Sequence, residues 1–156
     1  MRQALAAWVV SLAVAAPYPA AATTTPTPSR SFQTVLEAHL RAVSARNLQA
    51  LEQTLTRGAK LDVYLPDGRR LTTKAEFVDF HRQWFEQRGW TMRFEPVDRL
   101  VGADLAVATV RTRYEDVVDG KPYFSENWLS LTFRKEGSEW RFVEDQNTRI
   151  RSSAAK

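Results

Sequence analysis

The sequence contains no cysteine and only two histidines among its 156 residues. Without a thiol the chain has no disulfide, no zinc–thiolate or iron–sulfur site, no cysteine nucleophile and no lipid-modified cysteine. Catalytic zinc usually takes two or three imidazole ligands, so two histidines argue against a histidine-rich metal centre. We therefore expect neither a metal ion nor a cofactor.

Charge of one sign is also not concentrated anywhere in the chain. Lys and Arg total 22 against 18 Asp and Glu, a formal charge of +4, and no basic run exceeds two residues. A nucleic-acid surface needs basic residues clustered on one face, so we expect no nucleic-acid partner. The G-x-S-x-G, Walker, G-x-G-x-x-G and H-E-x-x-H patterns are absent as well.

The first 22 residues have the pattern of a secretory signal peptide. Arg2 precedes an apolar run over residues 4–16, and Ala20-Ala21-Ala22 supplies small residues for cleavage before Thr23. A membrane-spanning helix needs roughly 20 apolar residues, so this run is too short for one. We expect export to the periplasm or the medium, and no membrane association after cleavage. A Thr- and Pro-rich linker follows over residues 23–30.

Hydrophobic spacing predicts one domain over residues 31–150 and a disordered tail over residues 151–156. Apolar residues recur at helical spacing after Ser31, after Asn47, and after a Thr73–Glu76 capping box. After Gly89 the period changes to that of strands. We expect three helices, with strands at 60–65, 91–95, 105–114, 123–133 and 140–150. This order predicts an α+β fold, with the helices packed on one face of a curved, mainly antiparallel sheet.

The order of elements, the Pro66-Asp67-Gly68 turn and the segment W-R-F-V-E-D-Q-N-T on the last strand resemble the nuclear transport factor 2-like superfamily, in particular its SnoaL-like branch. The resemblance covers residues 32–150. It implies a cone-shaped sheet with an internal pocket, and frequent homodimerisation through the outer face of the sheet. This fold serves isomerases, cyclases, hydrolases, dehydratases and binding modules, so the activity depends on the site.

Ketosteroid isomerase, a member of this superfamily, uses an Asp base with an oxyanion hole made of Tyr and a protonated Asp. The resemblance places His39 at the position of the Tyr and Leu65 at that of the base. The protonated Asp falls on Leu129, or on Asn127 if the hairpin is two residues longer. Because a leucine cannot abstract a proton, the resemblance does not extend to steroid isomerisation.

His39 is the first candidate for chemistry, because it lies on the apolar stripe of the first helix. A neutral imidazole there acts as an acid or base, or is a core residue bonded to backbone. On the last strand, alternation places Asp145 and Asn147 on one face, and Glu144 and Gln146 on the other. Either pair faces the pocket, depending on whether a bulge interrupts the strand. The candidate catalytic residues are His39 and Asp145, and the candidate ligand-binding residues are Tyr64, His81, Trp84, Asn127 and Asn147.

Three functions remain open from the sequence. The first is an exported module that binds a small apolar or aromatic molecule. The second is a cofactor-independent acid–base enzyme of the cyclase, isomerase or hydratase kind that uses His39, with Asp145 orienting it or a water. The third is a dimeric assembly domain whose cavity is filled by side chains.

Overall fold

The computed structural model describes residues 30–153, so the predicted signal peptide lies outside the described residues. The elements are α1 (Phe32–Ser44), α2 (Leu48–Glu52), β1 (Lys60–Tyr64), β2 (Arg70–Thr73), α3 (Lys74–Glu86), β3 (Thr91–Val101), β4 (Leu105–Val118), β5 (Lys121–Glu136) and β6 (Glu139–Ser152). Within this region, no helix has the length and apolar character needed to cross a membrane.

The helices begin at the side-chain caps that the sequence predicts. The side chains of Ser31 and Asn47 each accept a hydrogen bond from a backbone N–H in the first turn of α1 and α2. At the start of α3, Thr73 and Glu76 form the reciprocal capping box. The helix starts are thus specified by hydrogen bonds within the first turn of each helix.

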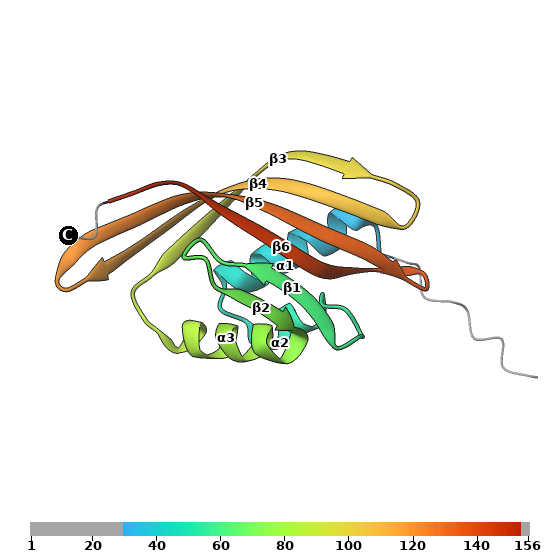
Figure 1. Ribbon diagram of the computed structural model, residues 1–156, viewed down its shortest axis with the longest axis horizontal. Coiled ribbons are helices and arrows are strands. Elements are labelled where there is room, and N and C mark those ends of the chain that lie inside the picture. Colours follow the sequence, from blue (N-terminus) through green and yellow to red (C-terminus); the bar gives the residue numbers. More distant parts are fainter. Residues whose placement is uncertain (1–29, 154–156) are drawn as a thin grey trace, which may run out of the picture.

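The six strands form one sheet in the order β2-β1-β6-β5-β4-β3. β1 pairs with β6 in parallel, and every other pair is antiparallel. The sheet curves over the helices without closing on itself (Figure 1). This arrangement confirms the predicted α+β fold, with three helices on one face of a curved, mainly antiparallel sheet.

Two strands differ from the prediction. β2 was not expected, because its four residues are too few to show alternation; it pairs with β1 at the sheet edge. β3 continues to Val101 although Pro96 interrupts its ladder. A register shift between Pro96 and Asp98 absorbs the interruption.

The prediction of a disordered tail is wrong for residues 151–153. β6 extends to Ser152, and the N–H of Ser153 donates to the carbonyl of Phe124 at 3.0 Å. The physical reason is that β5 begins at Lys121 and therefore offers its backbone to the end of β6.

The core fills one end of the space beneath the sheet, and polar side chains line the other. Phe32 of α1 packs edge-on against Phe133 and Trp140, with ring centroids 5.4 and 5.7 Å apart. Further along the same inward face of β5, apolar side chains give way to Asn127 and Ser125. The change from apolar to polar along one strand face positions the candidate site.

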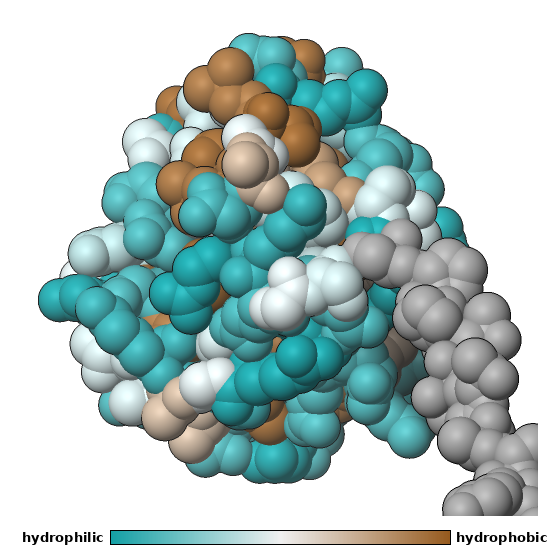
Figure 2. Space-filling model, turned by 90° about the vertical axis from the view of Figure 1, so that its right-hand side faces the viewer, coloured by the Kyte–Doolittle hydropathy of each residue, from teal (hydrophilic) through white to brown (hydrophobic). Residues whose placement is uncertain are grey.

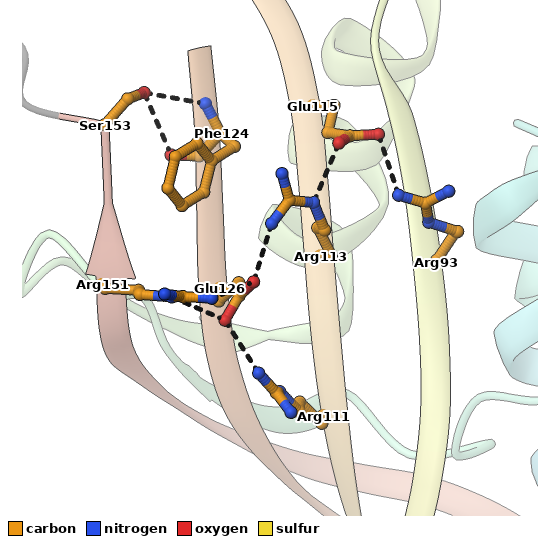
Figure 3. A network of polar contacts seen from close by, with 8 residues as sticks. All are labelled: Arg93, Arg111, Arg113, Glu115, Phe124, Glu126, Arg151 and Ser153. Atoms are coloured by element: carbon orange, nitrogen blue, oxygen red, sulfur yellow. Dashed lines mark hydrogen bonds and ion pairs between the residues drawn. The ribbon is translucent and has the colours of Figure 1, made fainter.

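The outer face of the sheet carries a charged network around a buried carboxylate (Figure 3). The Glu126 side chain is 5% exposed and accepts hydrogen bonds from Arg151, Arg111 and Arg113 at 2.7 to 3.0 Å. These bonds, with that from Arg151 the strongest influence, lower the pKa of Glu126 to about 2. Glu126 is therefore an anion whose hydrogen bonds link β5 to β4 and β6.

Candidate functional site

A cavity of about 260 Å³ lies between α1, α3 and the inward face of the sheet. Its wall is mainly apolar and aromatic, as is usual for sites that bind small molecules. The apolar and aromatic lining residues are Leu40, Val43, Val63, Leu65, Pro66, Phe77, Phe80, Trp84, Met92, Phe94, Tyr114, Tyr123, Leu129, Leu131 and Phe142.

A bulge in β6 decides which polar side chains enter this cavity. Val143 is an extra residue that has no partner on β5. Beyond it the strand phase changes, so that Asp145 and Asn147 line the cavity while Glu144 and Gln146 are exposed. Of the two alternatives that the sequence left open, the structure places Asp145 and Asn147 inside.

His39 is buried on α1 and borders the cavity. Its Nδ1 lies 2.8 Å from the Oγ1 of Thr54, whose hydroxyl donates its only hydrogen to the carbonyl of Leu51 at 2.6 Å. Nδ1–H must therefore be the donor to Thr54. The neutral ring then has a lone pair on Nε2, which makes no hydrogen bond to any described residue.

The environment of His39 keeps its ring neutral. Burial, and secondarily the charge of His81, lowers the pKa of His39 to about 3. No hydrogen bond joins His39 to Asp145, Asn147 or Asn127 within residues 30–153. The site therefore lacks a direct contact between His39 and Asp145, and Thr54 orients the imidazole instead.

His81 and Trp84 both line the cavity from α3. The Nδ1–H of His81 donates to the carbonyl of Phe77 at 2.9 Å, which again leaves the lone pair on Nε2. Burial lowers the pKa of His81 to about 4. The Trp84 indole stacks on Trp90, with centroids 4.4 Å apart at an interplanar angle of 15°. The indole is thus held rigidly at the cavity wall.

Asp145 and Asn147 present unpaired oxygen atoms. The Oδ1 atoms of both residues are buried and have no hydrogen-bond partner in the described part of the chain. Burial, with a smaller contribution from the charge of Glu144, raises the pKa of Asp145 to about 8. Asp145 is therefore mostly protonated at neutral pH and can donate as well as accept a hydrogen bond.

The last two sequence candidates lie in different surroundings. Asn127 lines the cavity, and its Oδ1 accepts a hydrogen bond from Ser125 at 3.0 Å. Tyr64 is not among the residues that line the cavity, so the structure does not bring this candidate together with the others. Strand alternation directs Val63 inward, and the Tyr64 ring instead lies 5.1 Å from the guanidinium of Arg70.

Four residues of the cavity wall were not among the candidates from the sequence. Tyr114, Tyr123 and Ser125 lie on the inward faces of β4 and β5, and Arg149 follows Asn147 on β6. Tyr114 donates to Asp116 Oδ2 at 2.6 Å. Strand alternation predicts the inward orientation of all four side chains, because each lies two residues or a multiple of two from another inward-facing residue. No group of three or more His, Asp or Glu side chains among residues 30–153 is placed to hold a metal ion.

Comparison with known proteins identifies the family of this chain. The SnoaL-like domain family matches residues 33–147. The chain belongs to the SnoaL-like family. No curated protein matches it. The charged outer face, the aromatic cavity and the β6 bulge are thus features of a SnoaL-like domain.

Solved structures share the fold at low sequence identity. A ketosteroid isomerase-like protein from Erwinia carotovora atroseptica is 18% identical over 76% of this chain and 93% of its own, with a TM-score of 0.64. A type 2 hexachlorocyclohexane dehydrochlorinase is 11% identical over 80% and 87%, with a TM-score of 0.66. The CaMKII hub of S. rosetta is 17% identical over 81% and 100%, with a TM-score of 0.61. These similarities concern the fold alone.

Proposed function

We propose that this SnoaL-like domain binds a small, mainly apolar organic molecule in the cavity. The observation that carries the proposal is the pair of buried, unpaired oxygens on Asp145 and Asn147 within an apolar wall. Leaving a buried polar group unpaired costs about 1–3 kcal/mol. A ligand that hydrogen-bonds to these oxygens while filling the apolar space would recover that free energy.

The uncharged state of the buried groups His39, His81 and Asp145 favours a mainly apolar ligand with few polar groups. His39 and His81 each present an acceptor on Nε2, and protonated Asp145 presents a donor. Flat rings of the ligand would pack against Trp84, which its stacking on Trp90 holds in place. These features fit an aromatic or alicyclic body carrying a hydroxyl or carbonyl group.

A fluorescent probe tests the proposal. N-phenyl-1-naphthylamine, which is neutral and brightens in apolar surroundings, should bind the wild-type domain. Leu129→Trp places an indole in the cavity and should abolish the signal. Ser130→Trp adds the same indole on the opposite face of β5 and should leave binding intact. Equal binding by both variants, or no binding by the wild type, would contradict the proposal.

A second function, acid–base catalysis by His39, has one observation in its favour. Thr54 fixes the Nδ1–H tautomer, so that the basic Nε2 remains free beside the cavity. The low pKa of His39 makes it a weak base, which ranks this function below ligand binding. If it operates, 2-tetralone in D₂O should exchange its acidic C–H protons faster with the wild type than with His39→Phe, as followed by NMR. Equal exchange rates would exclude this role for His39.

We also infer self-association through the outer face of the sheet and the β3–β4 hairpin at its edge. Apolar side chains gather at the β3–β4 hairpin, where Val97, Leu100, Val101 and Leu105 are 50 to 73% exposed, and Figure 2 shows hydrophobic surface there. Exposed apolar clusters mark interaction sites, and a hub domain shares the fold. Light scattering should give a dimeric mass for the wild type and a smaller mass for Leu100→Lys. A monomeric wild type at micromolar concentration would refute this inference.

Export completes the proposed function. The pattern of residues 1–22 supports cleavage by a signal peptidase before Thr23. Mass spectrometry of the exported protein should find Thr23 as the first residue. Exported protein that retains Met1 would refute cleavage.

A further inference from the structure

Among residues 30–153, Arg149 is the single cation in the wall of the cavity. It follows Asp145 and Asn147 on the inward face of β6 and is exposed to solvent, whereas Phe142 and Leu131 at the other end are buried. Its guanidinium makes no ion pair or hydrogen bond with any residue from 30 to 153. Arg149 thus lies at the open end of the cavity with its donors unused.

The remaining ionisable groups of the wall do not neutralise this cation. His39 and His81 are uncharged because burial lowers their pKa values. Asp145 is the one carboxyl group that the described part of the chain contributes to the wall, and its raised pKa keeps it mostly protonated at neutral pH. The net charge of the wall at neutral pH is therefore that of Arg149 alone.

Asp145 and Arg149 are the two ends of a row of polar side chains on β6, and Asn147 lies between them. Arg149 is four residues after Asp145 along β6, which is about 13 Å of strand. Leu65 and Phe80 line the cavity together with these residues. A ligand that contacts both ends needs an apolar body of about two fused rings between its polar groups.

We propose that the ligand is an apolar carboxylic acid, held at the open end by its carboxylate on Arg149 and at the inner end by a hydroxyl or carbonyl group on Asp145. The guanidinium fork matches the planar geometry of a carboxylate and binds it through two parallel hydrogen bonds. This inference rests on the proposed function, because it names the chemical class of the molecule in the cavity.

Isothermal titration calorimetry with matched probes tests the inference. The first probe, 6-hydroxy-2-naphthoate, has a carboxylate and a hydroxyl at opposite ends of two fused rings; 6-hydroxy-2-naphthamide has the same shape without the charge. The carboxylate should bind at least about 5-fold more tightly, a modest ratio because Arg149 is exposed to solvent. Arg149→Gln should remove this preference and leave the affinity for the amide unchanged.

Arg88→Gln is the matched control, because Arg88 is exposed outside the cavity wall and makes no ion pair with a described residue. It changes the net charge equally and should retain the preference. Equal affinities of the wild type for both probes, or a preference that survives Arg149→Gln, would overturn the carboxylate inference. If N-phenyl-1-naphthylamine binds and neither naphthyl probe does, the inference fails while the proposed function stands. If none of the three binds, both fail.

Discussion

Replacing Asp145 by Asn should make the domain more stable at pH 8 without stabilising it at pH 4. Asparagine keeps the size and polarity of the side chain but cannot ionise. In the wild type, burial and the nearby charge of Glu144 raise the pKa of Asp145 from 3.8 to about 8. The folded protein therefore keeps a proton that the unfolded chain has lost over most of this pH range.

Proton linkage gives the direction in which the free energy of unfolding changes with pH. Between pH 3.8 and about 8 the folded state binds one more proton at Asp145 than the unfolded state, so the free energy of unfolding falls as the pH rises and levels off above pH 8. Each pKa unit corresponds to about 1.36 kcal/mol, which sets an upper limit of roughly 5–6 kcal/mol. Because the residue is only partly buried, solvent screening should reduce the effect to about 2–3 kcal/mol.

The assay is urea denaturation at several pH values from 4 to 8, followed by tryptophan fluorescence. The difference in unfolding free energy between Asp145→Asn and the wild type should grow steadily over this range. Asp104→Asn, which changes an exposed carboxylate outside the cavity wall, is the control and should follow the wild type. If the curves for Asp145→Asn and the wild type are parallel, the raised pKa and the reasoning built on it are wrong.

The two buried histidines and the carboxylate of Glu126 on the outer face give three further predictions. His39→Ala should lower the free energy of unfolding by about 1–3 kcal/mol in urea denaturation, because the bond to Thr54 and the ring packing are lost; no change would contradict this. His81 stays neutral when folded, so stability should rise with pH from about 4 to 6.5, and His81→Phe should reduce that slope. The lowered pKa of Glu126 contributes stability above about pH 4.5 that disappears toward pH 2. Glu126→Gln should therefore lose less stability on acidification, and acid titrations that coincide with the wild type would refute the network.

Local signals in the sequence were sufficient for most of the fold. The caps at Ser31, Asn47 and Thr73 fix the helix starts by bonds within one turn, so they can be read without knowing the tertiary structure. The long strands show alternation over many residues. The short edge strand β2 gave no such signal, because its four residues are too few to show alternation.

The site was less predictable because its details depend on non-local contacts. The extra residue Val143 reverses the face of β6, and nothing in the sequence distinguishes it from its neighbours. Thr54 orients His39 across 15 positions of chain and lies outside regular secondary structure. For Tyr64, alternation alone was sufficient, since it places Val63 and Leu65 on the cavity side.

The unpaired polar atoms in the cavity lower the free energy of unfolding, and packing elsewhere in the domain must offset this loss. The inward faces of β5 and β6 supply both Phe133 and Phe142 of the core and the unpaired oxygens of Asp145 and Asn147. Each unpaired oxygen costs about 1–3 kcal/mol, a sizeable fraction of the roughly 5–15 kcal/mol by which a typical domain is stable. Apolar residues at both positions would give a more stable domain, so the polar atoms are explained more directly by a bound molecule than by folding. The unpaired oxygens of Asp145 and Asn147 therefore favour ligand binding over an assembly domain, for which a filled, apolar cavity would suffice.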